Sequence, residues 1–174
     1  LASRIAEAPD DWQSDQALVA ATYRASIDRA DAKAPGARAM LTSAAFFAPD
    51  EIPLALLLDA FEDEAAKRAS DALARYSLWR RQEANGPHGP TFGLHRLLQP
   101  ALRAELTEDA YMETAKACAR RLAARFEGNP GDVRTWPINA PLAQHALALS
   151  NATPDKAVSI ELASALGWTD QFFQ

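Results

Sequence analysis

The stretch Thr91-Phe92-Gly93-Leu94-His95-Arg96-Leu97-Leu98-Gln99 changes its pattern at His95. Residues 91–94 have the short, β-prone composition of a strand, whereas the leucines that follow recur at helical spacing. His95 therefore falls at a strand-to-helix junction. It can be a capping or core histidine satisfied by backbone groups, an exposed junction residue, or a donor to an anionic ligand that another part of the fold holds.

A second short aromatic run, Ser77-Leu78-Trp79-Arg80-Arg81, lies upstream of this stretch. Between the two runs is Asn85-Gly86-Pro87-His88-Gly89-Pro90, a dense cluster of turn-forming residues. Two strand-like runs joined by such a cluster predict a β-hairpin with a loose tip. Because a single hairpin is only marginally stable alone, we expect it to pack on neighbouring helices.

Helical periodicity dominates the rest of the chain. Before the hairpin, apolar stripes predict four helices, the third with Pro53 in its first turn and the fourth running from about Glu62 to Tyr76. After the hairpin, we expect a stripe of Leu97, Leu98, Ala101 and Leu102. The further helices are expected to begin at Thr107, at Asn139-Ala140-Pro141 and at Thr153-Pro154-Asp155.

This pattern predicts a mostly α protein, with a winged helix (helices plus one β-hairpin) followed by a small α-helical segment. We expect residues 1–16 to be a linker, 17–106 the winged-helix domain, and 107–174 a helical segment leading into an α-hairpin repeat array. The chain lacks an initial Met, which favours a fragment of a longer protein.

Composition narrows the class of function. The 174 residues carry a net charge of −5, which argues against a dedicated nucleic-acid binder. The single Cys118 excludes an internal disulfide and fits a reducing, cytoplasmic compartment. The longest apolar run, Ile52 to Leu58, is too short to cross a bilayer.

The chain shows no motif for catalysis or for a metal. The turn cluster at 86–90 contains two prolines, which lack the N–H donors of a phosphate-binding loop. The three histidines are dispersed, and no Gly-x-Ser-x-Gly motif occurs. We therefore expect no enzyme activity and no cofactor in this segment itself.

Two alternative functions remain open at this point. A DNA-binding winged helix would use the helix over residues 62–76, but the mixed charges of that helix disfavour contact with phosphates. Arg80 and Arg81 in the hairpin are then the positive charges that could contact DNA. A helical interaction or oligomerisation scaffold would instead bury His95.

A basic cluster on the long helix after Thr107 is a further candidate site. It consists of Lys116, Arg120, Arg121 and Arg125, at spacings of four and five residues. Such a cluster is either a solvated face paired with carboxylates or a contact to an acidic neighbouring domain.

Several pieces of the chain together resemble the winged-helix segment of bacterial STAND (NB-ARC-type) NTPases, which carry tetratricopeptide-type repeats. The pieces, in order, are Thr22-Tyr23-Arg24-Ala25-Ser26-Ile27, Phe46-Phe47-Ala48-Pro49-Asp50-Glu51-Ile52-Pro53, Ala72-Leu73-Ala74-Arg75-Tyr76-Ser77-Leu78, Leu94-His95-Arg96-Leu97-Leu98-Gln99, and Trp136-Pro137 with Pro141-Leu142-Ala143-Gln144-His145-Ala146-Leu147.

The resemblance implies a regulatory role. In that family a winged-helix histidine approaches the β-phosphate of bound ADP, and by position His95 would be that residue, with Arg96 in place of the family's Asp. ADP or ATP with magnesium would belong to the parent protein. The implied partners are an upstream nucleotide-binding domain and downstream repeats of the same chain.

Overall fold

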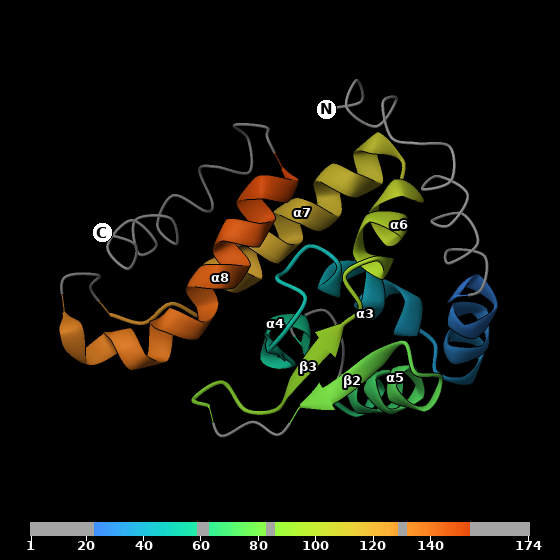
Figure 1. Ribbon diagram of the computed structural model, residues 1–174, viewed down its shortest axis with the longest axis horizontal. Helices are drawn as coiled ribbons and strands as arrows, with labels where there is room; N and C mark the ends of the chain where they lie inside the picture. Colours follow the sequence, from blue (N-terminus) through green and yellow to red (C-terminus); the bar gives the residue numbers. More distant parts are fainter. Residues whose placement is uncertain (1–22, 59–62, 83–85, 129–131, 154–174) are drawn as a thin grey trace.

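The computed structural model describes residues 23–58, 63–82, 86–128 and 132–153, which form a mostly helical fold around a small antiparallel sheet (Figure 1). The expectation of a mostly α protein is confirmed. Among these residues, the first helix covers 23–33. The elements that follow are α3 (Ala37–Ala44), β1 (Ile52–Pro53), α4 (Ala55–Leu58), α5 (Asp63–Arg75), β2 (Trp79–Gln82), β3 (Thr91–Leu94), α6 (Leu98–Ala104), α7 (Glu108–Ala123), the 3-10 helix η1 (Val133–Thr135) and α8 (Trp136–Ala152).

The predicted hairpin is present. Strands β2 and β3 pair antiparallel, with Trp79 opposite Leu94 and Gln82 opposite Thr91. The hairpin packs on α5 through Trp79, whose indole N–H donates to the carbonyl of Ser70 at 3.0 Å. The Trp79 ring also stacks on Phe92, with 4.3 Å between ring centroids. Trp79 is therefore a core residue that joins the sheet to α5.

A third strand corrects the sequence prediction at Pro53. Instead of opening a helix, Ile52–Pro53 forms β1, which pairs antiparallel with β3 and gives the sheet order β1-β3-β2. Pro53 is tolerated here because an edge strand can spare a backbone N–H. The helix that the periodicity indicated starts at Ala55 as α4.

The second correction concerns α8. Its expected start at Asn139-Ala140-Pro141 is wrong, because the helix begins at Trp136 and contains Pro141. Pro137 occupies the first turn, where a missing N–H costs nothing. Asn139 is buried and its side chain pairs with both the N–H and the C=O of Glu127, at 3.0 and 2.9 Å. These bonds hold the α7–α8 connection against α8.

The expected start of α7 is confirmed. Thr107 is the N-cap, and its hydroxyl accepts from the N–H of Ala110 at 3.3 Å. The expected linker 1–16 lies outside the described residues. The residues from Pro154 onward also lie outside them. Of the predicted helix start at Thr153-Pro154-Asp155, the structure therefore describes only Thr153.

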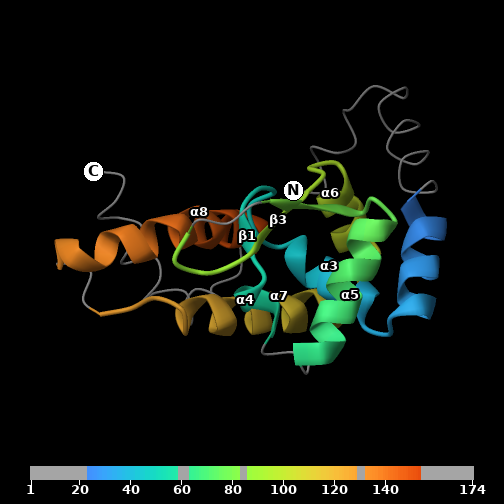
Figure 2. The same ribbon diagram turned by 90° about the horizontal axis from the view of Figure 1, so that it is seen from below.

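Helices α3 and α4 lie between two groups of elements, with α5 and the hairpin on one side and α7 with α8 on the other (Figures 1 and 2). A single cluster of buried apolar side chains runs through all of them, from Ile27 to Leu149. The buried thiol of Cys118 on α7 reaches the carbonyl of Ser43 at the end of α3, at 3.6 Å. Residues on both sides of position 106 thus share one core, and the expected division at that position stays a prediction.

A shared core predicts that α7 and α5 unfold together. Leu122 on α7 and Leu73 on α5 are both fully buried. Leu122→Ala and Leu73→Ala should each lower the free energy of unfolding by about 2–5 kcal/mol. Denaturant unfolding followed by circular dichroism and by tryptophan fluorescence should give coincident transitions in both variants. Two separate transitions, only one of which moves in Leu122→Ala, would contradict a shared core.

Candidate functional site

His95 occupies the turn between β3 and α6, and its side chain is exposed. Its Nδ1 accepts from the N–H of Leu97 at 3.3 Å, and its carbonyl accepts from the N–H of Leu98 at 2.9 Å. Because Nδ1 is the acceptor, the neutral ring carries its proton on Nε2. The sequence left three roles open for His95, and this position rules out the core role.

The same turn corrects the predicted stripe of α6. Leu98 and Leu102 are buried, but Leu97 precedes the helix and is 40% exposed. The strand-to-helix junction therefore spans three exposed residues, His95, Arg96 and Leu97.

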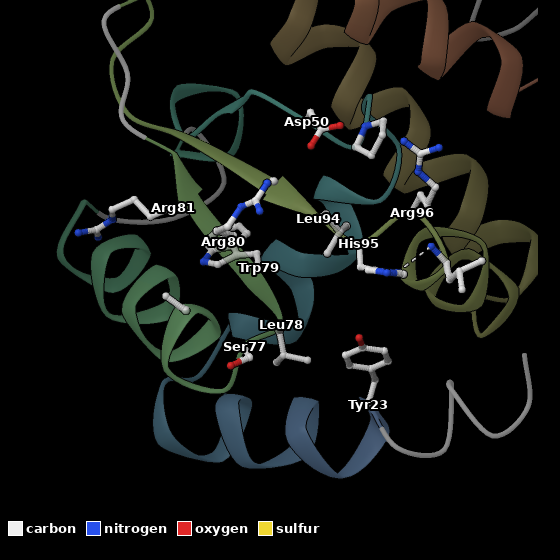
Figure 3. A pocket seen from close by; sticks show the side chains of 14 residues that line it. Tyr23, Asp50, Ser77, Leu78, Trp79, Arg80, Arg81, Leu94, His95 and Arg96 are labelled. Atoms are coloured by element: carbon white, nitrogen blue, oxygen red, sulfur yellow. Dashed lines mark hydrogen bonds between the residues drawn. The ribbon is translucent and has the colours of Figure 1, made fainter.

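A pocket of about 830 Å³ lies beside this junction (Figure 3). Its walls come from the first described helix, the segment before β1, the α5–β2 turn and the hairpin. The lining residues are Tyr23, Pro49, Asp50, Ala74, Ser77, Leu78, Trp79, Arg80, Arg81, Gly93, Leu94, His95, Arg96 and Leu97. Segments far apart in the sequence thus meet around His95.

The pocket has an apolar floor and a polar rim. Leu78, Trp79 and Leu94 are buried beneath it. Figure 3 shows the hydroxyl of Tyr23 directed toward His95 from the opposite side. A concave surface of this kind can receive a group that carries both apolar and hydrogen-bonding parts.

The charges on the rim favour an anion. Arg80 and Arg96 are exposed, and neither has an ion-pair partner within the part of the chain that the structure describes. Arg81 points away from them and pairs with Asp71 of α5 at 3.0 Å. Asp50 is the acidic residue of the lining. The arginines therefore outnumber the carboxylate, which suits a phosphate or carboxylate group.

The structure divides the predicted basic cluster: Lys116, Arg120 and Arg121 lie on α7, whereas Arg125 follows the end of that helix at Ala123. None of the four lines the pocket. Arg125 donates to the carbonyl of Ala55 in α4 at 3.0 Å, which makes it a structural contact. Arg121 is half-buried, and its Nη1 has no hydrogen-bond partner among the described residues. Lys116 is half-buried and Arg120 exposed. Whether the cluster contacts a neighbouring domain stays a prediction.

The helix that a DNA-binding winged helix would use carries mixed charge on its exposed face. Glu64 and Asp71 alternate there with Lys67, Arg68 and Arg75. Since Arg81 of the hairpin is paired with Asp71, part of the positive charge at this surface is already neutralised.

His145 is the residue that sequence reasoning missed. It lies on α8, is fully buried, and contacts the segment before β1 with both ring nitrogens. The pKa of His145 is lowered to about 4, chiefly by burial. The bond to the Glu51 carbonyl opposes this shift, and the electrostatic interaction with His88 adds to it. A histidine in line with the apolar Leu142 and Leu149 was the available signal, since a polar group on a buried face needs partners.

Within the described residues, no helix has the length and apolarity needed to cross a membrane. Those residues also bring together no group of three or more histidine, cysteine or acidic side chains that could bind a metal. Comparison of the chain with protein families, with curated proteins and with solved structures finds no match.

The lowered pKa of His145 predicts acid sensitivity. Between pH 6.5 and 4 the unfolded chain binds a proton at this residue that the folded chain does not, so stability is lost as the pH falls. From pH 7 to 4.5, the free energy of unfolding should fall on the order of 2 kcal/mol more in the native chain than in His145→Gln. Urea titrations at both pH values measure this difference. Equal losses in the two proteins would show that His145 does not titrate in this window.

Proposed function

We propose that this chain is a non-catalytic regulatory segment of a STAND-type signalling NTPase. In this proposal a winged helix docks its His95 face on a separate nucleotide-binding domain. The observation that carries the proposal is the exposed His95 at the rim of a concave, arginine-bearing pocket. A buried His95, satisfied by its own helices, would have favoured a plain scaffold.

The sheet topology supports the winged-helix part of the proposal. The order β1-β3-β2 places a two-helix unit, α4 and α5, between the edge strand and the hairpin. A winged helix has this succession, with the loop of the hairpin as the wing. The junction after the last strand is then free to face a neighbouring domain.

The chemistry of the junction supports a phosphate partner. The Nε2–H of His95 is available as a donor because Nδ1 already accepts from Leu97. A hydrogen bond from this group to a charged phosphate is worth about 1.5–3 kcal/mol net. Made in only one of two domain arrangements, it would shift their ratio by roughly tenfold to a hundredfold. Arg96 and Arg80 would add charge to the same arrangement.

In this proposal α8 connects the pocket side of the molecule to the downstream repeats of the parent protein. It packs on α7, and it also reaches the pocket wall through His145. The segment would therefore relay nucleotide state in one direction and sensor state in the other.

A DNA-binding winged helix is the second candidate, and the exposed Arg80 in β2 is the observation in its favour. That function requires duplex binding that weakens steeply with salt and with Arg80→Ala. Absence of a mobility shift at low salt would remove it.

The full-length gene product provides the direct test. Its upstream part should contain a phosphate-binding loop. The His95→Ala variant should release bound ADP roughly tenfold faster, because one phosphate contact of the closed state is lost. Release of a fluorescent ADP analogue, followed by stopped flow, measures the rate.

Lys67→Ala is the matched control, since Lys67 is exposed on α5 and does not line the pocket. It should release ADP at the native rate. The proposal fails if His95→Ala and Lys67→Ala both release ADP at the native rate, or if no upstream nucleotide-binding domain exists.

A further inference from the structure

His145 connects α8 to residues 48–51, a short segment that lies far from it in the sequence. Its Nδ1 accepts from the N–H of Ala48 at 3.2 Å, and its Nε2 lies 3.1 Å from the carbonyl oxygen of Glu51. The ring also meets Phe47 edge-on, at 5.8 Å between centroids. One imidazole ring therefore contacts the backbone of both the first and the last residue of the segment.

These bonds define the state of the ring. A backbone N–H can only donate, so Nδ1 must be unprotonated, and a carbonyl can only accept, so Nε2 must carry the proton. The ring is neutral and fully buried. Its removal would leave the N–H of Ala48 and the C=O of Glu51 without this partner, the first in a buried position and the second in a partly buried one.

Residues 48–51 form one wall of the pocket. Pro49 and Asp50 line it, and the carbonyl of Pro49 accepts from the N–H of Leu94, the residue before His95, at 2.7 Å. The segment approaches β3 closely: a Cβ added at Gly93 would lie 3.4 Å from the Asp50 carboxylate. The position of this wall is thus linked directly to the backbone that carries His95.

The conformation of this segment requires external support. Glu51 has a φ of 55°, in the left-handed region, which is strained for a residue other than glycine. Its N–H is held by the Gln82 side chain at 2.9 Å, and its carbonyl by His145. Without the bond from His145 to the Glu51 carbonyl, the strain at Glu51 would favour relaxation of the segment to an unstrained conformation.

We propose that His145 is a positioning residue that couples α8 to the pocket, by holding residues 48–51 in the conformation that supports Leu94 and His95. A displacement of α8 would move the pocket wall and, through the Pro49 carbonyl, the junction that bears His95. The regulatory meaning of this link rests on the proposed function, whereas the mechanical link does not.

Amide hydrogen exchange of the full 174-residue chain tests the link, with the Leu94 amide as reporter and the Met40 amide of α3 as reference. His145 makes no hydrogen bond to Leu94, so a change there must pass through the segment. In His145→Phe, which keeps an aromatic ring and loses both bonds, Leu94 should exchange roughly tenfold faster relative to Met40. His145→Gln, which can still donate to Glu51, should give a smaller increase.

Leu149→Ala is the matched control. Leu149 is fully buried on the same helix and has no hydrogen bond to residues 48–51. It should speed exchange at Leu94 and Met40 by the same factor, as a loss of global stability does. If His145→Phe does not fold, His145→Gln decides.

Parallel changes at Leu94 and Met40 in the His145 variants would overturn the coupling. That outcome would leave the proposed function standing, because exchange needs no nucleotide. Conversely, native ADP release from His95→Ala in the full-length protein would remove the proposed function and leave the link between α8 and the pocket intact.

Discussion

The arrangement of this molecule depends on how residues 48–51 are held between α8 and the sheet. The segment leaves α3 and enters β1 through a left-handed residue, Glu51, so it does not keep its path by local preference alone. His145 satisfies its backbone from one side, while Leu94 and Gln82 bond it from the other. Since β1 pairs with β3 directly after it, the sheet, the pocket and the α8 contact all share this one constraint.

The pocket follows from that arrangement. The hairpin brings Arg80 beside the junction that carries His95 and Arg96. Arg81 instead forms an ion pair with Asp71 of α5, so its charge is partly neutralised. What remains is an apolar floor with a rim of excess positive charge. Such a surface is suited to a phosphate group. In the proposed function another domain presents that phosphate, and His95 is then half of a site.

Much of the fold could be predicted from periodicity, and less of the site. The hairpin, α5 and the Thr107 cap follow from turn residues, apolar spacing and a hydroxyl before acidic residues. The strand at Pro53 and the early start of α8 could not be predicted, since long-range pairing decides the first and a buried Asn139 the second. His95 was found from its junction. His145 was missed because its partners are main-chain groups, which no side-chain motif records.

The central claim, that His95 faces a bound nucleotide on another domain, has a direct spectroscopic test. Cys118 is buried and its pKa is raised to about 12, chiefly by burial, so within these 174 residues a nitroxide reagent should label only an introduced cysteine. The full-length protein with Leu97→Cys, at an exposed position of the junction that keeps His95, should show strong dipolar broadening of the nitroxide spectrum when labelled and loaded with manganese-ADP. A label at the exposed Glu113→Cys on α7 should show little. Equally weak broadening at both positions would contradict the account.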